Sequence, residues 1–199
     1  MNLAELIAEC KAITRRPDLH DRTQSAVLAA TLKVHHMDFW YKDLVEVTIE
    51  FDDPQFISNF APTDVIPRYR KAKYIRIWEG DATSGVPLNF LTPIQIEQAL
   101  DGYGYHKNNV FYQAGNLIQI RTTQPLKRAL FGCYVHPNVT TSAYSSWIAV
   151  EEPYAIVHEA CRVIFREIGA TEQAATQERL LAEILTSMRM SYIDDIPVT

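Results

Sequence analysis

The sequence predicts an α+β protein in which a helical bundle, built from the N- and C-terminal helices, carries a central β-rich appendage. Apolar residues recur at helical spacing over residues 1–43 and again over residues 147–192. Between them, residues 44–146 alternate apolar and polar side chains and contain frequent turn residues, which is typical of strands. A short apolar and acidic segment, residues 193–199, follows the last helix, and we expect it to form an extended arm.

Two helices are expected before the β-rich insertion. The first covers roughly residues 2–14 and ends before Pro17, because proline disfavours helical backbone in the residue that precedes it. Asp21 is a good N-cap for the second helix, which we expect to run to about Phe39. The apolar stripe of the first helix comprises Leu3, Leu6, Ile7, Cys10 and Ile13. The stripe of the second comprises Val27, Leu28, Leu32, His35 and Phe39.

The insertion is expected to contain short strands joined by turns. Alternation predicts a strand over residues 44–51 with one wet face, and Asp52-Asp53-Pro54 then forms a turn. Ala114-Gly115-Asn116 is a hairpin signal between two further strands. The remaining strands are expected over residues 56–60, 74–78, 110–113, 117–121 and 129–135.

Less regular structure is expected at three places in the insertion. Residues 79–87 are polar and predict a loop. Thr92 as a cap and Pro93 as the first helical residue predict a short helix through Leu100. Residues 138–146 are rich in serine and threonine and are expected to form a linker.

Two more helices are expected after the insertion. Glu151-Glu152-Pro153 is a strong start signal, because carboxylates favour the positive end of the helix dipole and proline suits the first turn. Gly169 is expected to end this helix, and Thr171 to cap the next one. We expect the terminal helices to share one core. That core is expected to contain Leu6, Leu28, Leu32, Val157, Ile164, Leu181 and Ile184.

Charge is distributed unevenly along the chain. Residues 1–150 carry 15 acidic and 15 basic side chains, whereas residues 151–199 carry 9 acidic and 4 basic ones, which gives the net charge of −5. A protein whose main role is to grip duplex DNA would show a basic excess in some long segment. No run approaches the ~18 apolar residues of a membrane span, so we expect no membrane partner. The three cysteines are expected to be reduced, buried thiols of a cytosolic protein.

No complete set of catalytic or metal-binding residues is present in the sequence. His158-Glu159 matches the start of a zinc-protease motif, but that chemistry needs a second histidine at position 162, which is Arg162. His35 and His36 are neighbours in a helix and diverge by about 100°, so they do not suit one metal ion. We therefore expect no catalytic residues, no metal and no cofactor, and predict that the protein is not an enzyme.

The sharpest local feature is a basic run interleaved with Tyr69, Tyr74 and Trp78. Its cations are Arg68, Arg70, Lys71, Lys73 and Arg76. Cations that alternate with aromatic rings are typical of single-strand nucleic-acid binding. They are equally typical of a strand edge protected by charge. A third interpretation is a basic patch that meets the acidic C-terminal region of a neighbouring subunit.

Several stretches of the chain resemble the head–tail adaptor (connector) proteins of tailed bacteriophages. The N-terminal helices carry the resemblance through residues 3–7, 16–19 and 36–43, and the basic run through residues 66–71 and 74–76. The hairpin at residues 112–121, the strand at 130–137 and the final pair of helices complete it.

The resemblance implies a structural virion protein that forms a ring beneath the portal and extends the DNA channel toward the tail. Such rings are usually dodecameric, and they lie in the virion neck after assembly in the host cytoplasm. The implied partners are further copies of the chain, the portal, a tail or nozzle protein below, and DNA that passes without sequence-specific binding. The portal-docking arm would be Ile193, Asp194, Asp195, Ile196, Pro197, Val198 and Thr199. The five cations of the basic run are candidates for inter-subunit contacts.

Two alternatives remain open. The chain could be a small single-stranded nucleic-acid-binding module that uses residues 68–78. It could also be a small cytosolic enzyme of unrecognised type, which would need a pocket lined by titratable groups.

Overall fold

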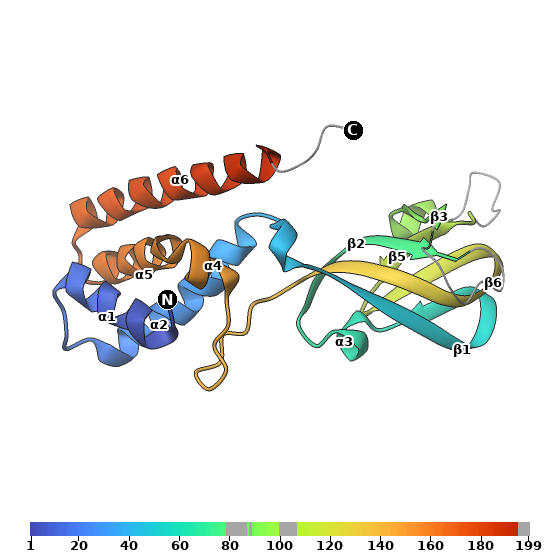
Figure 1. Ribbon diagram of the computed structural model, residues 1–199, viewed down its shortest axis with the longest axis horizontal. Helices are drawn as coiled ribbons and strands as arrows, with labels where there is room; N and C mark the ends of the chain where they lie inside the picture. Colours follow the sequence, from blue (N-terminus) through green and yellow to red (C-terminus); the bar gives the residue numbers. More distant parts are fainter. Residues whose placement is uncertain (79–86, 88, 100–106, 195–199) are drawn as a thin grey trace. The chain divides into compact units, whose positions relative to one another are not determined.

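A computed structural model of the chain describes residues 1–78, 87, 89–99 and 107–194 (Figure 1). The chain folds into two compact units. Unit 1 comprises Met1–Trp40 and Pro137–Thr199, and unit 2 comprises Tyr41–His136. Each unit has its own hydrophobic core.

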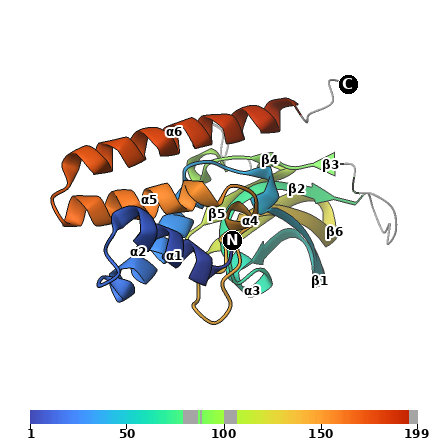
Figure 2. The same cartoon turned by 60° about the vertical axis from the view of Figure 1, so that its left-hand side comes forward.

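Unit 1 is helical, with α5 at its centre. Helix α5 packs against the other long helices of the unit (Figure 2). Its buried residues are mostly apolar and recur at helical spacing, with Glu159 and Arg162 as the charged exceptions. The helices are α1 (Leu3–Thr14), α2 (His20–His36), α4 (Trp147–Glu151), α5 (Pro153–Glu167) and α6 (Thr171–Asp194). None of the helices among the described residues is both long and apolar enough to cross a bilayer.

Local signals explain where these helices begin and end. Asn2 and Glu5 form a reciprocal capping box at the start of α1, with Asn2 Oδ1 2.9 Å from the Glu5 amide. Helix α2 begins at His20, with Leu19 as N-cap, so the expected cap Asp21 lies in the first turn instead. Gly169 follows α5 with φ at 77°, a left-handed conformation that suits glycine.

The core of unit 1 corrects the expected buried face of α2. Leu28 and Leu32 were expected in the core, but both are only half-buried and lie outside it. The buried face of α2 is instead built from smaller side chains: Thr23, Ala26, Val27, Ala30, Thr31, Val34 and His35. Small residues allow α2 to approach α5 closely, so the helix is rotated relative to the leucine stripe. The other expected members are confirmed: Leu6, Val157, Ile164 and Leu181 are buried in the core, and Ile184 packs against it.

Unit 2 is organised around one long strand, β6 (Leu117–Val135). Along one side β6 pairs antiparallel with β1 (Leu44–Phe60). Along the other side it pairs first with β5 (Val110–Ala114) and then with β2 (Tyr69–Ile77). The Gly115 turn between β5 and β6, with φ at 61°, confirms the expected hairpin.

A short segment links β2 to β5 and nearly closes the sheet. Its first part, β3 (Asn89–Phe90), pairs antiparallel with the end of β2, and its second part, β4 (Thr92–Pro93), pairs parallel with β5. Between them, the Leu91 amide donates to the Ile75 carbonyl at 2.9 Å. The enclosed core contains Ile75, Leu91, Phe111, Ile118, Ile120, Leu126 and Phe131, among others.

The expected helical bundle with a β-rich appendage is therefore wrong. The fold is α+β, but its β part is a nearly closed six-stranded sheet with a complete core, and hence a compact unit in its own right. The sequence pattern suggested separate short strands because bulges interrupt the alternation. Strand β1 continues through the turn expected at residues 52–54, with register shifts between Glu50 and Ile57.

Other local expectations in the insertion also need correction. The helix expected over residues 92–100 is replaced by β4 and a single 3₁₀ turn, Ile96–Gln98, while Leu100 lies outside the described residues. The loop expected at residues 79–87 lies outside them too, except for Pro87. Residues 138–146 belong to unit 1 and include an antiparallel bridge between Asn138 and Ser145.

Candidate interaction site

The basic run forms most of β2, and the register of β2 on β6 decides where its side chains lie. Lys71, Tyr74 and Arg76 pair with Tyr134, Gly132 and Leu130 of β6. Those β6 residues alternate with Cys133, Phe131 and Ala129, which are completely buried in the core. Lys71, Tyr74 and Arg76 therefore lie on the face of the sheet opposite to the core, which we call the outer face.

Two other cations of the run lie where bulges interrupt the pairing of β2 with β6. The register shifts between Tyr69 and Lys71 and again between Ala72 and Tyr74, which leaves Arg70 and Lys73 as the inserted residues. Beyond β2, strand β3 pairs only with Arg76 and Ile77. Bulges and charged side chains are common devices against unwanted strand addition at an edge. This geometry supports the interpretation of residues 68–73 as a protected edge that remains accessible to side-chain contacts.

Tyr74 is fixed against the outer face by two neighbours, Gly132 and Glu46. Its ring lies over Gly132, where a side chain would collide with it. Its hydroxyl donates a hydrogen bond to the Glu46 carboxylate on β1. Burial, together with the hydrogen bond and the negative charge of Glu46, raises the pKa of Tyr74 to about 12.

Arg76 is stacked on two aromatic rings, and no carboxylate of the described residues forms an ion pair with it. Its Cζ lies 4.2 Å from the ring centroid of Phe90 and 5.1 Å from that of Tyr74. Its Nε is buried, with no hydrogen-bond acceptor in the part of the chain that the structure describes. Phe90 itself is 58% exposed. The result is a rigid, partly apolar surface with a positive centre.

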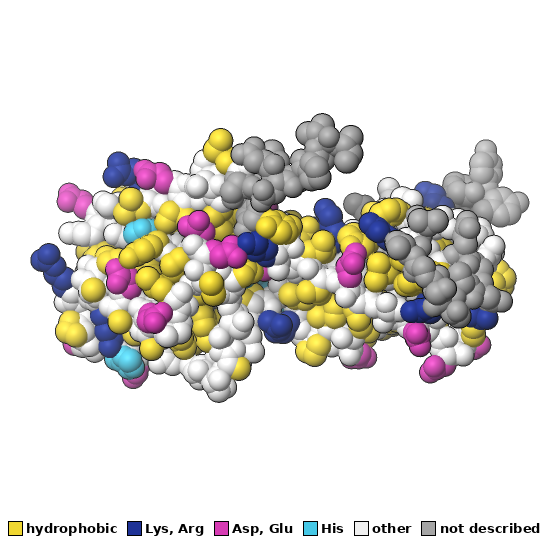
Figure 3. All heavy atoms as spheres, in the orientation of Figure 1, with side chains coloured by type: hydrophobic (Ala, Val, Ile, Leu, Met, Phe, Trp, Pro, Cys, Tyr) yellow, Lys and Arg dark blue, Asp and Glu magenta, His cyan; other side chains and the backbone are white. Residues whose placement is uncertain are grey.

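The outer face also carries acidic groups. Arg128 lies over the Trp78 ring, with its Cζ 4.7 Å from the centroid, and its Nε is 3.5 Å from a carboxylate oxygen of Glu50. Glu46 and Glu50 of β1 therefore lie on the same face of the sheet as Arg76 of β2 and Arg128 of β6. In Figure 3 basic, acidic and hydrophobic side chains are mixed over the β strands. A surface with both charge signs and exposed aromatic rings suits a protein partner better than a phosphate backbone.

Sequence reasoning identified part of this surface and missed the rest. It singled out Tyr74, Arg76 and Trp78, and it placed Glu46 on a wet strand face. It missed Phe90 and Arg128, because nothing in the sequence gives the register that brings them to β2.

Arg68, the first cation of the basic run, lies immediately before β2. Its guanidinium donates a hydrogen bond to the His136 carbonyl at 3.0 Å.

The candidate metal and catalytic residues of unit 1 have structural partners. His35 Nε2 lies 2.9 Å from Ser146 Oγ in the core, and His158 Nδ1 lies 2.6 Å from Gln177 Oε1. Cys10 Sγ donates to the Val157 carbonyl at 3.8 Å. A hydrogen bond with Cys161, and then burial, raise the pKa of the Cys10 thiol far above its usual range. Among the described residues, no three His, Cys, Asp or Glu side chains are placed to hold one metal ion.

A buried ion cluster joins α2 to α5. The Glu159 carboxylate, 1% exposed, accepts hydrogen bonds from Lys33 Nζ at 2.7 Å and from both Nε and a terminal nitrogen of Arg162, at 2.9 Å and 2.7 Å. Burial alone would raise the pKa of Glu159, but the bonds from Arg162 and Lys33 outweigh it, so the pKa is lowered. Both carboxylate oxygens are satisfied, which is typical of a structural ion pair rather than a reactive acid.

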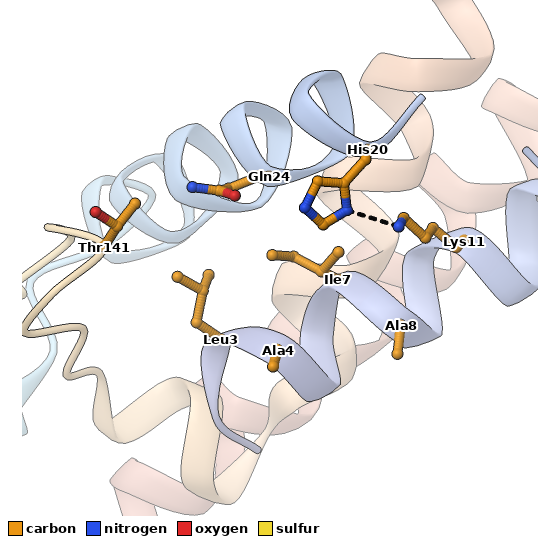
Figure 4. A pocket seen from close by; sticks show the side chains of 8 residues that line it. All are labelled: Leu3, Ala4, Ile7, Ala8, Lys11, His20, Gln24 and Thr141. Carbon is orange, nitrogen blue, oxygen red and sulfur yellow. Dashed lines mark hydrogen bonds between the residues drawn. The ribbon is translucent and has the colours of Figure 1, made fainter. Parts of the chain in front are cut away.

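A shallow groove of about 510 Å³ lies between α1 and α2 (Figure 4). Leu3 and Ile7 of α1 form its apolar wall, and Gln24 of α2 lies opposite. At one end Lys11 Nζ lies 2.7 Å from His20 Nδ1. The lining contains no carboxylate, thiol or serine hydroxyl, and its polar groups are those of Lys11, His20, Gln24 and Thr141.

The expected portal-docking arm lies mostly outside the described residues. Helix α6 extends to Asp194, so Ile193 and Asp194 are the last residues of a helix. Residues 195–199, which include Ile196, Pro197 and Val198, are not described. The docking role of the arm therefore stays a prediction.

No protein-family model matches this chain, and no curated protein matches it either.

Proposed function

We propose that this chain is a structural subunit of a tailed-bacteriophage virion, a head–tail adaptor that forms a ring beneath the portal and extends the DNA channel toward the tail. The resemblance of its helices, basic run and hairpin to that family supports the proposal. Its partners would be further copies of the chain, the portal and a tail protein. The virion neck would be its location.

One structural observation carries the proposal: the outer face of unit 2 has the composition of a protein interface. Arginine side chains stacked on aromatic rings, with exposed Phe90 at the centre and glutamates beside them, match the residue types that dominate binding energy between proteins.

The same observation argues against single-strand nucleic-acid binding. Glu46 accepts a hydrogen bond from the Tyr74 hydroxyl and Glu50 lies beside Arg128, so two carboxylates share the face that would meet phosphates. Unit 2 carries 10 acidic and 10 basic side chains, so it lacks the basic excess that is typical of nucleic-acid-binding domains.

Electron microscopy and mass photometry of the purified chain, alone and mixed with portal rings of tailed phages, test the proposal. The expected result is closed rings of many copies, either free or attached coaxially to the portal. A chain that stays monomeric alone and fails to bind any portal would overturn it. Salt-dependent binding to oligonucleotides without ring formation would favour the nucleic-acid-binding module instead.

A further inference from the structure

An exposed apolar surface lies on unit 1 at the junction of α4 and α5. Val150 is 72% exposed and Tyr154 is 42% exposed, although both are large hydrophobic side chains. Val150 also borders a hollow of about 380 Å³ that is lined by Met1, Tyr144 and others. Exposed apolar groups beside a hollow are typical of protein contact sites.

Carboxylates surround this surface. Glu5 lines the same hollow as Val150, and Glu9 accepts a hydrogen bond from the Tyr154 hydroxyl at 3.5 Å. Glu151 follows Val150 directly in the chain. We call this surface the acid-rimmed patch; it consists of Val150, Tyr154, Glu5, Glu9 and Glu151.

Unit 1 is acidic, and unit 2 contains a basic segment within a neutral whole. Unit 1 carries 14 acidic and 9 basic side chains, so the entire net charge of −5 lies on it, whereas unit 2 is neutral. Within unit 2, residues 68–76 carry five cations and no acid. We call its first part, Arg68, Arg70, Lys71 and Lys73, the basic strand segment.

We infer that the acid-rimmed patch of one copy docks on the basic strand segment of a second copy. The chemistry of the two surfaces supports this pairing: the cations would meet Glu9 and Glu151, while Val150 and Tyr154 would cover the aliphatic stems of the lysines and arginines. The inference rests on the proposed ring, and it identifies the contact between its subunits.

The pairing has a consequence for assembly. The two surfaces belong to different units, so each copy offers one patch and one segment and can use them on two different neighbours. Such heterologous contacts continue from copy to copy and generate a closed ring when the rotation between neighbours closes. Reciprocal use of both surfaces between the same two copies would instead give a two-fold dimer, which mass photometry distinguishes from a ring.

Charge reversal tests the pairing. Lys71→Glu with Lys73→Glu lowers the net charge of the segment from +4 to zero and puts carboxylates at two of its four positions, and Glu9→Lys with Glu151→Lys makes the patch basic. Each double variant would place like charges opposite each other, and we expect more than tenfold less assembled protein by mass photometry at low ionic strength. An equal mixture of the two variants should assemble again, because every contact between unlike variants restores opposite charges. The chain with all four substitutions should assemble by itself.

Matched controls separate this contact from net charge. Glu172→Lys with Glu183→Lys, and Lys107→Glu with Lys127→Glu, make the same changes in net charge at other exposed positions. Both should assemble like the unmodified chain. Val150→Ser keeps the charge and removes an exposed apolar side chain, so it should weaken assembly while the thermal unfolding midpoint stays unchanged.

The outcomes are distinguishable. Rings that form normally from both charge-reversed variants would overturn the contact and leave the proposed function intact. Loss of assembly in each variant without recovery in the mixture would mean that the two surfaces meet other partners, which also overturns the pairing. An unmodified chain that never assembles, alone or on a portal, would overturn both the ring and the contact.

Discussion

The ring of Tyr74 lies directly on the backbone of Gly132, across the β2–β6 pair. A Cβ added at residue 132 would lie 2.5 Å from the ring, which is closer than any real contact. The glycine is therefore required by the close approach of the tyrosine, since the backbone there does not adopt a positive φ. This contact sets the position of Tyr74, which in turn stacks with Arg76 on the outer face.

Gly132→Ala should destabilise unit 2 by about 1–3 kcal/mol, because overpacking forces either the ring or the strand to move. The hydroxyl bond to Glu46 and the stacking with Arg76 restrict how far the ring can yield. Urea unfolding followed by circular dichroism measures the loss.

Tyr74→Ala provides the matched background for that substitution. With the ring removed, Gly132→Ala should have little further effect, so a double-mutant cycle should give a coupling of about the same size as the single loss. Additive effects of the two substitutions would show that Gly132 matters for another reason.

Leu32→Ala should cost about 1 kcal/mol or less, since Leu32 is half-buried and outside the core of unit 1. Ile164→Ala should cost about 2–5 kcal/mol, because Ile164 is 1% exposed at the centre of that core. Thermal or urea unfolding measures both losses of unfolding free energy. If Leu32→Ala and Ile164→Ala cost the same, the rotation of α2 described above would be contradicted.

These two residues show what the sequence could and could not reveal. Helical periodicity located the helices of unit 1, because each buries a continuous stripe. The rotation of α2 was not predictable, since leucines and alanines occupy adjacent stripes and only close packing on α5 selects the alanines. In unit 2 the closure depends on β3 and β4, which have two residues each and leave no periodic signal. Phe90, which stacks on Arg76, belongs to β3. The sequence could therefore single out Arg76 but could not identify the residues that surround it.

The Glu159 cluster should make stability depend on pH in the acid range. Because the folded-state pKa of Glu159 is lowered from 4.5, its contribution is complete above that value and is lost as pH falls through the folded pKa. Glu159→Gln should destabilise the protein at neutral pH by about 3–5 kcal/mol, since Arg162 would be buried without its carboxylate. Urea unfolding across pH 3–7 measures both effects.

The difference in unfolding free energy between the Glu159→Gln variant and the unmodified protein should narrow as pH falls through the lowered folded-state pKa of Glu159, because the carboxyl of the unmodified protein becomes protonated there. A difference that stays constant over the whole range would show that the cost arises from packing rather than from charge. Glu178→Gln is a suitable control, because its pair with Arg166 at 2.8 Å is exposed on both sides. Its effect should be below about 1 kcal/mol at every pH.

Deletion of residues 195–199 should leave folding unchanged and abolish attachment to the portal. The last buried side chain of α6 among those described is Met188, so the residues removed lie beyond the stripe that packs on α5. The deleted segment offers Ile196 and Val198 beside Asp195, which suits docking as an extended peptide in a basic groove. Equal unfolding midpoints, together with loss of co-sedimentation with portal rings, are the expected results. A chain with the same five residues in scrambled order separates sequence from length. Portal binding by the truncated chain at normal strength would exclude the docking role, and a lowered unfolding midpoint would place these residues in the fold of unit 1.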